Sequence, residues 1–286
     1  MGVEERGLSC FEPADEDLAP PVAANRRLLL AEVVEGKSFL SANPLELDAG
    51  VSARCNISCG FCNGPEEGYG DLTDRRRDEI AGMLPSLMRF GVCGPGEPLM
   101  SPNYLALLGQ ISDTGYPSLS VSLTTNGTLL SPAFLERHAN VPWSHVRISL
   151  NAGSPETHER MTGSKLFRGI MRNLDALCAL RERRPGRFRV TLSCVLGEVQ
   201  MGDLHRFAEV VTSHGTDVAI EPMTGNLGSL SPWVRPDRLA ILADELRSVA
   251  DDYALRNPPL SRAFRAAEGY ARTRLGGDEF LPLALH

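Results

Sequence analysis

The sequence predicts an α/β fold, an open parallel barrel built from about six strand-helix units. Strand-like runs alternate with helical segments from residue 45 onward, the alternation has no long interruption, and the strands have one apolar and one polar face. At 286 residues the chain is longer than a usual domain, yet single barrels reach this size. We therefore expect one barrel core at 45–225, a tail and helix at 1–44, and a helical extension at 226–286.

The strand-like runs are spaced so that a helix fits between each pair. They fall near residues 45–49, 89–93, 118–124, 145–151, 188–196 and 217–221. The acid- and proline-rich opening predicts a loose tail, followed by a helix around Leu28 to Val34. Ser131 followed by Pro132 predicts a helix start. We expect His158 and His205 on helix surfaces.

The alternate strand positions favour a barrel over a doubly wound sheet. One face is apolar, whereas the other is mostly small or polar. A doubly wound sheet, the alternative, buries both faces, and a closed barrel fills its interior with branched apolar side chains. We therefore expect a wider, incomplete barrel that holds a polar ligand. Its substrate is expected to contact Glu46, Asp48, Ser122, Arg147 and Thr191.

Composition and charge exclude several classes of protein. Hydrophobic residues make up 42% of the chain, which excludes a disordered or fibrous protein. The formal net charge is −7, so we expect no binding to nucleic acid or to an anionic membrane. No apolar run is long enough to span a bilayer. Seven cysteines without a secretory signal predict a cytoplasmic protein with metal or redox chemistry.

Three cysteines stand close together in the segment Cys55-Asn-Ile-Ser-Cys59-Gly-Phe-Cys62, directly after the first strand. In a parallel barrel this is the carboxyl end of a strand, where barrel enzymes place their chemistry. A cubane iron–sulfur cluster bound by three local thiolates keeps one iron open to another molecule. Zinc would need a fourth protein ligand or a water, and this segment has no histidine. Buried structural cysteines, a further alternative, do not explain three thiols in one glycine-containing turn.

This spacing resembles the C-x3-C-x-aromatic-C signature of the radical S-adenosylmethionine (radical SAM) enzymes. The resemblance covers about residues 45–225 and implies a [4Fe-4S] cluster on Cys55, Cys59 and Cys62. It implies that the amino and carboxylate groups of S-adenosylmethionine bind the fourth iron, with Phe61 beside the adenine. It also implies that a flavodoxin- or ferredoxin-type protein supplies the electron.

Residues at other strand ends match further motifs of the family. Gly94, Gly96 and Glu97 resemble its glycine-glycine-glutamate segment, which implies that the carboxylate binds the methionine ammonium. Pro95 stands where the first of the paired glycines is usual, and taken alone this segment is also a common turn. The resemblance implies further cofactor contacts at Thr125, Asn126, Ser149, Asn151 and Glu221.

The segments LTTNGTLL and RISLNAGSPETHERMTG resemble the branch that modifies peptides and often carries a cysteine-rich SPASM-type extension. No cysteine follows Cys194, so we expect one cluster and no such extension. The opening 44 residues are too short for a cobalamin-binding or leader-peptide-binding domain, so neither is expected. Cys93 points to the expected interior and is a candidate hydrogen-atom donor, although small buried cysteines are usually inert.

The resemblance implies an enzyme that cleaves S-adenosylmethionine reductively and abstracts hydrogen from a biosynthetic substrate, and the polar interior predicts that this substrate is polar. The substrate classes that fit are a sugar, a nucleoside, an amino acid and a peptide. The alternative is an iron–sulfur electron-transfer or zinc-binding protein that does not cleave S-adenosylmethionine.

Overall fold

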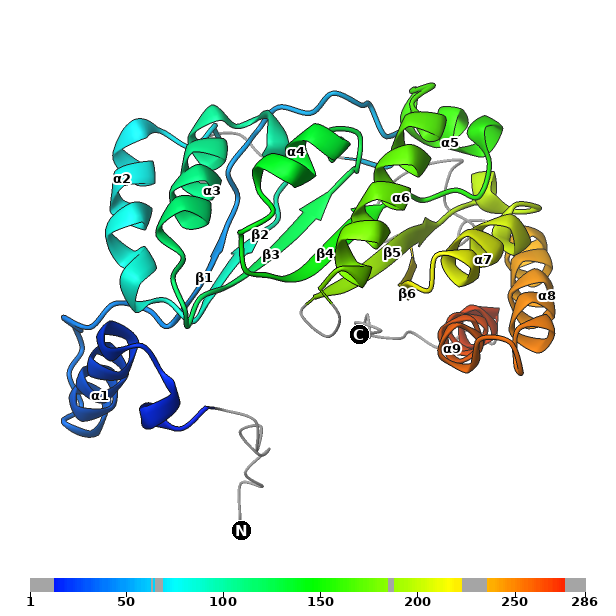
Figure 1. Cartoon of the computed structure of the whole chain (residues 1–286). Helices are drawn as coiled ribbons and strands as arrows, with labels where there is room; N and C mark the ends of the chain where they lie inside the picture. The colour runs from blue at the N-terminus through cyan, green and yellow to red at the C-terminus, as the bar shows by residue number, and fades with distance from the viewer. Residues whose placement is uncertain (1–12, 63, 65–68, 185–187, 223–235, 276–286) are drawn as a thin grey trace, which may run out of the picture.

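The computed structural model describes residues 13–62, 64, 69–184, 188–222 and 236–275. Within them, six strands form one parallel sheet in which each strand pairs with its neighbour in the sequence (Figure 1). The strands are β1 Glu46–Ala49, β2 Arg89–Val92, β3 Ser120–Thr125, β4 Trp143–Ser149, β5 Arg189–Leu196 and β6 Asp217–Pro222. A doubly wound sheet reverses its strand order in the middle. The observed order therefore confirms the open barrel and excludes the alternative.

Helices connect consecutive strands and lie over one face of the sheet (Figure 1). They are α2 Asp74–Met83, α3 Pro102–Thr114, α4 Pro132–Arg137, α5 Pro155–Thr162, α6 Phe167–Glu182 and α7 Leu204–Ser213. Three short 3-10 helices lie in these connections within the described residues, η2 Leu84–Ser86, η3 Pro98–Met100 and η4 Glu198–Gln200, and η1 Asp15–Asp17 lies ahead of the first strand. Parallel strands need such crossovers, and the helices cover the apolar face that the strands present.

Three of these helices begin at a Ser-Pro pair, as predicted for Ser131. The hydroxyls of Ser101, Ser131 and Ser154 accept hydrogen bonds of 3.2, 3.2 and 3.3 Å from the backbone N–H three residues later. Proline at the first helical position lacks an N–H that the helix would leave unpaired. The local sequence therefore fixes where α3, α4 and α5 begin.

The two faces of the sheet differ as the alternation predicts. Strand side chains that face the helices are buried, among them Phe90, Val92, Val121, Val146, Ile148, Val190 and Leu192. On the opposite face, Arg89 donates to Glu46 and Asp48 across β1 and β2, at 2.9 Å each. Arg189 donates to Asp217 across β5 and β6 at 2.8 Å. Such partly exposed ion pairs contribute little stability, so the apolar face holds the barrel together.

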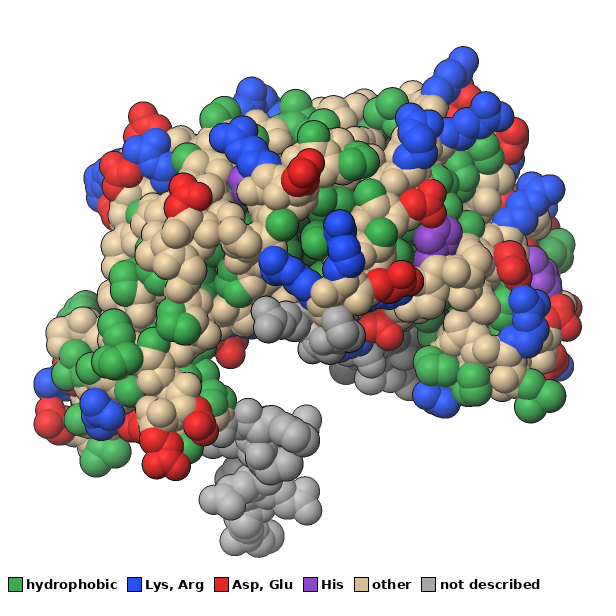
Figure 2. All heavy atoms as spheres, viewed as in Figure 1, with side chains coloured by type: hydrophobic (Ala, Val, Ile, Leu, Met, Phe, Trp, Pro, Cys, Tyr) green, Lys and Arg blue, Asp and Glu red, His purple; other side chains and the backbone are tan. Residues whose placement is uncertain are grey.

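Helix α1, Pro20–Val34, packs on the barrel through Val22 and Ala23 against Met88. Its buried Glu32 accepts hydrogen bonds from the backbone N–H of Ser41 at 2.9 Å and of Ala42 at 3.0 Å. These bonds fold the following loop back onto the helix. Apolar side chains remain exposed over α1 and this loop (Figure 2), namely Leu28, Leu30, Val33, Val34, Phe39 and Leu40.

After β6, helix α8 Pro236–Asp252 packs against α7 and against α9 Pro258–Leu275, and α9 contacts β6. Parts of the expected tail (1–12) and extension (226–235 and 276–286) lie outside the described residues. Across the described ranges, no helix is long and apolar enough to cross a membrane.

One expectation about the helices was wrong. His158 is 1% exposed, because α5 turns it inward, where its Nδ1 lies 3.1 Å from the carbonyl oxygen of Ser164. Burial lowers the pKa of this imidazole. His205 is exposed, as expected.

Candidate active site

The carboxyl ends of β2 to β6 and the loop after β1 enclose a cavity of about 310 Å³. The structure brings to this one cavity every candidate cluster ligand, cofactor contact and hydrogen donor that the sequence singled out, namely Cys55, Cys59, Phe61, Cys62, Cys93, Gly94, Gly96, Glu97, Thr125, Asn126, Ser149, Asn151 and Glu221. Segments up to 166 positions apart in the sequence therefore meet at one end of the barrel, as parallel strands require.

The loop that carries the three cysteines is tied to two neighbours. The backbone N–H groups of Ser58 and Gly60 donate to carbonyl oxygens at the end of α5, at 3.0 and 2.9 Å. The backbone N–H of Glu97 donates to the carbonyl oxygen of Arg54 at 2.7 Å. These bonds hold the loop over the strand ends and leave Cys55 and Cys62 exposed and Cys59 partly exposed.

The donor set of this loop fits a cubane cluster. A cubane attaches each thiolate to a different iron, so the three sulfurs must face a common space, and all three cysteines line the same cavity. In the part of the chain that the structure describes, no three Cys, His, Asp or Glu side chains form a site for a single metal ion. Burial, and then the neighbouring Cys55 and Cys62, raises the pKa of Cys59 to about 12. Coordination by a metal deprotonates such a thiol.

Glu97 lines the cavity, but hydrogen bonds already engage its carboxylate. Oε1 accepts from the Thr125 hydroxyl at 2.7 Å and from the Leu99 backbone N–H at 3.2 Å. Oε2 accepts from the Asn126 backbone N–H at 2.8 Å. The side chain is 2% exposed, and this burial raises its pKa above the ordinary value, although the three hydrogen bonds oppose the rise. A carboxylate has about four acceptor positions, so one is left for a ligand.

Gly94 and Gly96, before Glu97, allow other parts of the protein to approach their backbone closely. A Cβ on Gly96 would lie 2.4 Å from the carbonyl oxygen of Ser52. A Cβ on Gly94 would lie 2.9 Å from the hydroxyl of Tyr69. Sequence reasoning missed Tyr69, because nothing local pairs it with the end of β2. Its hydroxyl is buried without a hydrogen-bond partner in the described structure.

Asn151 follows β4 in a left-handed conformation, with a φ of 60° that asparagine tolerates better than most residues. Its Oδ1 accepts from the Val195 backbone N–H at 2.8 Å, and its Nδ2 donates to the Ser149 carbonyl oxygen at 3.3 Å. Gln200 donates to the Asn151 carbonyl oxygen at 3.2 Å. Asn151 therefore joins the ends of β4 and β5, while the adjacent Ser149 is only partly buried and faces the cavity.

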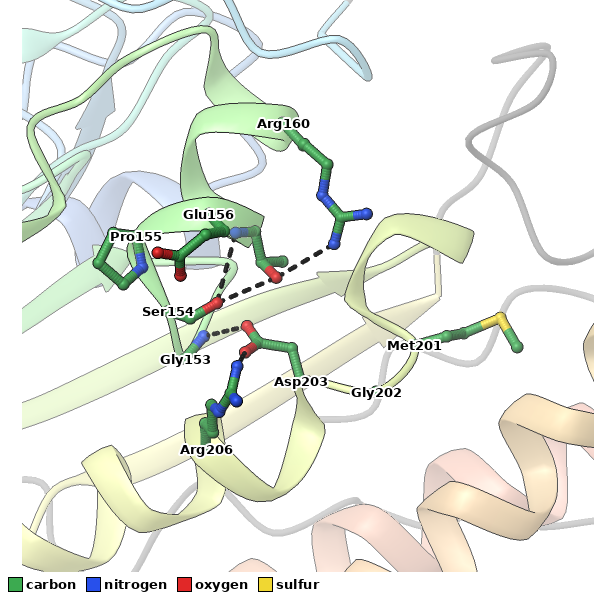
Figure 3. A pocket seen from close by; sticks show the side chains of 10 residues that line it. Gly153, Ser154, Pro155, Glu156, Arg160, Met201, Gly202, Asp203 and Arg206 are labelled. Carbon is green, nitrogen blue, oxygen red and sulfur yellow. Dashed lines mark hydrogen bonds and ion pairs between the residues drawn. The ribbon is translucent and has the colours of Figure 1, made fainter.

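A second, more open hollow of about 560 Å³ lies behind this turn, between the start of α5 and the start of α7 (Figure 3). Asp203, which is 3% exposed, accepts from the Gly153 backbone N–H at 2.7 Å there. Its other oxygen pairs with Arg206 at 3.7 Å. The contact fixes the β4–α5 turn from outside the main cavity.

The expected substrate-facing side chains are only partly placed as predicted. Of the five, Arg147 lines the cavity, where it pairs with Glu221, whereas Ser122 is partly buried and is not part of the lining. Glu46 and Asp48 instead accept hydrogen bonds from Arg89. The Oγ1 atom of Thr191 lies 2.8 Å from Nε2 of His145. The cavity lining also includes Pro95, Thr124 and Ser193, to which the sequence analysis gave no role in the site, and Ile57 and Val195, which sequence reasoning missed. Alternation along β3 and β5 was the available signal for Thr124 and Ser193.

Comparison with known proteins connects this site to one family. A family model described as the Radical SAM superfamily matches residues 50–211. The FeMo cofactor biosynthesis protein NifB of Frankia alni is 28% identical over 279 residues, which cover 81% of this chain and 51% of that protein. The PqqA peptide cyclase of Ruegeria pomeroyi is 25% identical over 217 residues, covering 72% and 53%. The chain thus spans about half the length of the curated relatives it matches.

Solved structures agree on the fold. SuiB of Streptococcus suis, bound to its precursor peptide SuiA, matches with a TM-score of 0.56 at 17% identity, covering 86% of this chain and 56% of that one. The same protein bound to S-adenosylmethionine matches with a TM-score of 0.53 at 17% identity, covering 87% and 53%.

Proposed function

We propose that this chain, which belongs to the radical SAM superfamily, abstracts a hydrogen atom from a polar biosynthetic substrate. Enzymes of this family use a [4Fe-4S] cluster and S-adenosylmethionine, which disfavours the electron-transfer and zinc-binding alternatives. When bound, these groups supply reductive cleavage of the sulfonium and a 5′-deoxyadenosyl radical. The observation that carries the proposal is the single cavity shared by the three cysteines and the strand-end polar residues.

In this proposal each part of the cavity has one task. Cys55, Cys59 and Cys62 hold the cluster, and Phe61 borders the adenine. The remaining acceptor position of Glu97 receives the methionine ammonium, a match between a buried carboxylate and a cation. The backbone near Gly94 and Gly96, with Thr125 and Asn126, shapes that end of the site. Ser149, Asn151 and Glu221 face the sugar and adenine from the other side.

The substrate is proposed to enter from the open, polar face of the sheet. A volume of about 310 Å³ is at the small end for a pocket that holds one small molecule, so cosubstrate and substrate together need the adjoining face. Arg147 and Glu221 both line the cavity and form an ion pair there, so together they offer a substrate one charge of each sign. A peptide fits this arrangement, and the relatives include a PqqA peptide cyclase. Sugars, nucleosides and amino acids remain in the proposed class.

Three further roles belong to the same proposal. Cys93 is exposed and lines the cavity, where its thiol passes a hydrogen atom to a substrate radical and becomes a thiyl radical, which one electron from the external reductant and one proton from solvent return to the thiol. A flavodoxin- or ferredoxin-type protein supplies the electron. The protein acts in the cytoplasm and binds no nucleic acid.

The test begins with the cluster. Replacing Cys55, Cys59 and Cys62 together by alanine should abolish cubane iron and sulfide after anaerobic reconstitution. Cys178→Ala, which removes a buried thiol in α6, is the matched control and should keep the full complement. A full complement of iron in the triple variant would refute the ligand assignment.

The second step measures chemistry. Reduced, reconstituted enzyme with S-adenosylmethionine should release 5′-deoxyadenosine slowly in the absence of substrate and faster with the right substrate. Deuterium from a labelled substrate should appear in the 5′ methyl group of the 5′-deoxyadenosine. Transfer from a polar metabolite would identify the small-molecule class, and transfer only from a peptide the other class. Fully loaded, reduced enzyme that never cleaves S-adenosylmethionine would overturn the proposal in favour of electron transfer.

A further inference from the structure

The amide of Asn126 has its direction fixed by its neighbours. This residue follows β3 and is 7% exposed. Its Oδ1 accepts two hydrogen bonds from Thr128, from the backbone N–H at 2.9 Å and from the hydroxyl at 2.6 Å. Because two donors face the oxygen, the NH2 group must point the other way. A flipped amide would set donors against donors.

Both hydrogens of that NH2 group face the cysteine loop. Nδ2 lies 2.9 Å from Oδ1 of Asn56 and 3.7 Å from Sγ of Cys55. Asn56 is itself oriented, since its Nδ2 donates to the Thr128 hydroxyl at 2.8 Å. Asn126, Asn56 and Thr128 thus form a closed ring of hydrogen bonds in which the Cys55 sulfur is the remaining acceptor.

The turn that carries this amide is also fixed from behind. The Asn126 backbone N–H donates to the buried Glu97 at 2.8 Å. Asn173 of α6 donates to the carbonyl oxygens of Gly127 at 2.9 Å and Thr128 at 3.1 Å. Hydrogen bonds thus fix the backbone N–H, the Oδ1 and the Nδ2 of Asn126. The side-chain N–H therefore keeps its direction when the charge on the sulfur changes.

We propose that Asn126 is a positioning residue that raises the reduction potential of the cluster by donating its side-chain N–H to the Cys55 sulfur. A hydrogen bond to a ligand sulfur stabilises the more negative, reduced state relative to the oxidised state. The one-electron reduction needs only the external reductant, and no bond to Asn126 forms or breaks. The inference rests on the part of the proposed function that places the cluster on Cys55, and it is independent of S-adenosylmethionine cleavage.

The test is a redox titration of the reconstituted cluster followed by electron paramagnetic resonance, without S-adenosylmethionine. Asn126→Ala removes the donor but keeps the backbone bond to Glu97. At a fixed potential we expect about a tenfold fall in the ratio of reduced to oxidised cluster, a shift of about 59 mV for one electron. Asn126→Asp, which keeps the shape and adds charge, should lower the potential further. The matched control Asn56→Ala breaks the ring but keeps the two Thr128 donors that orient the Asn126 amide towards Cys55, so it should leave the potential near that of the wild type.

A vibrational measurement separates tuning from a general disturbance of the loop. A hydrogen bond weakens the iron–sulfur bond of its acceptor, so resonance Raman should show a higher Fe–S(Cys) stretching frequency in Asn126→Ala than in Asn56→Ala. Unchanged potentials and frequencies in both Asn126 variants would overturn the proposal, as would failure of both to hold a cluster. If wild-type enzyme does not cleave S-adenosylmethionine, the proposed function is wrong. The reduction potential and the Fe–S(Cys) frequency would still test the role of Asn126, because neither depends on that cleavage.

Discussion

Replacing Glu97 by glutamine removes a charge at a buried position and keeps the side chain's shape. A glutamine can place its carbonyl oxygen where Oε1 stands and keep the bonds from Thr125 and Leu99. Its NH2 group then faces the Asn126 backbone N–H, donor against donor, so the 2.8 Å bond at Oε2 is lost. One hydrogen bond to a charged group contributes about 1.5 to 3 kcal/mol. We expect the free energy of unfolding to fall by about that amount.

The assay is urea unfolding of the protein without cofactors, followed by circular dichroism at neutral pH. Glu156→Gln changes an exposed carboxylate on α5 and is the matched control, expected within about 0.5 kcal/mol of wild type. On reconstituted enzyme, Glu97→Gln should also weaken S-adenosylmethionine binding about tenfold to a hundredfold with iron content unchanged.

The two measurements can fail separately. An unchanged free energy of unfolding would refute the reasoning that the Glu97 carboxylate joins the ends of β2 and β3. A loss of stability with unchanged affinity for S-adenosylmethionine would show that Glu97 only supports the turn.

Two further predictions concern the scaffold. Hydrogen bonds, first from the Ser41 hydroxyl, lower the pKa of Glu32 from 4.5 to about 2, so its contribution to stability is present above pH 4.5 and lost as the pH falls towards 2. Glu32→Gln should remove that part of the acid dependence when unfolding is measured against pH. A Cβ on Gly153 would lie 2.1 Å from the Phe207 backbone nitrogen, so Gly153→Ala should destabilise by about 1 to 3 kcal/mol in urea unfolding. Gly109→Ala in α3 meets nothing within 4 Å and should stabilise, and equal effects at both glycines would contradict the packing argument.

Much of the fold was predictable because its signals are local. Alternation of period two marked the strands, and their polar alternate positions indicated an open barrel rather than a doubly wound sheet. Ser131 and Pro132 marked the start of α4, since a capping hydroxyl and a residue without an N–H act within one turn. The prediction that His158 lies on a helix surface was wrong, because which face of the short helix α5 is buried depends on packing against other elements.

The candidate site divides in the same way. The spacing of Cys55, Cys59 and Cys62 identified the loop, and position at strand ends brought the other candidates together, because parallel strands all end at one edge of the barrel. The directions of those side chains did not follow from position. Glu97 was expected to bind the methionine ammonium, and nothing in the sequence indicated that its carboxylate also accepts three hydrogen bonds from the protein.

The sequence by itself determined the fold class, the barrel's polar face and the identity of the cysteine loop, since each depends on periodicity or on spacing within a few residues. Only the tertiary structure decided which polar atoms are already used. The Asn126 amide points at the Cys55 sulfur 71 positions away, and Arg147 meets Glu221 across 74 positions. Such pairings depend on the register and twist of neighbouring strands, and hydrogen bonds act only over a few ångströms. No pattern along the chain encodes which partner a side chain reaches once the strands are brought together.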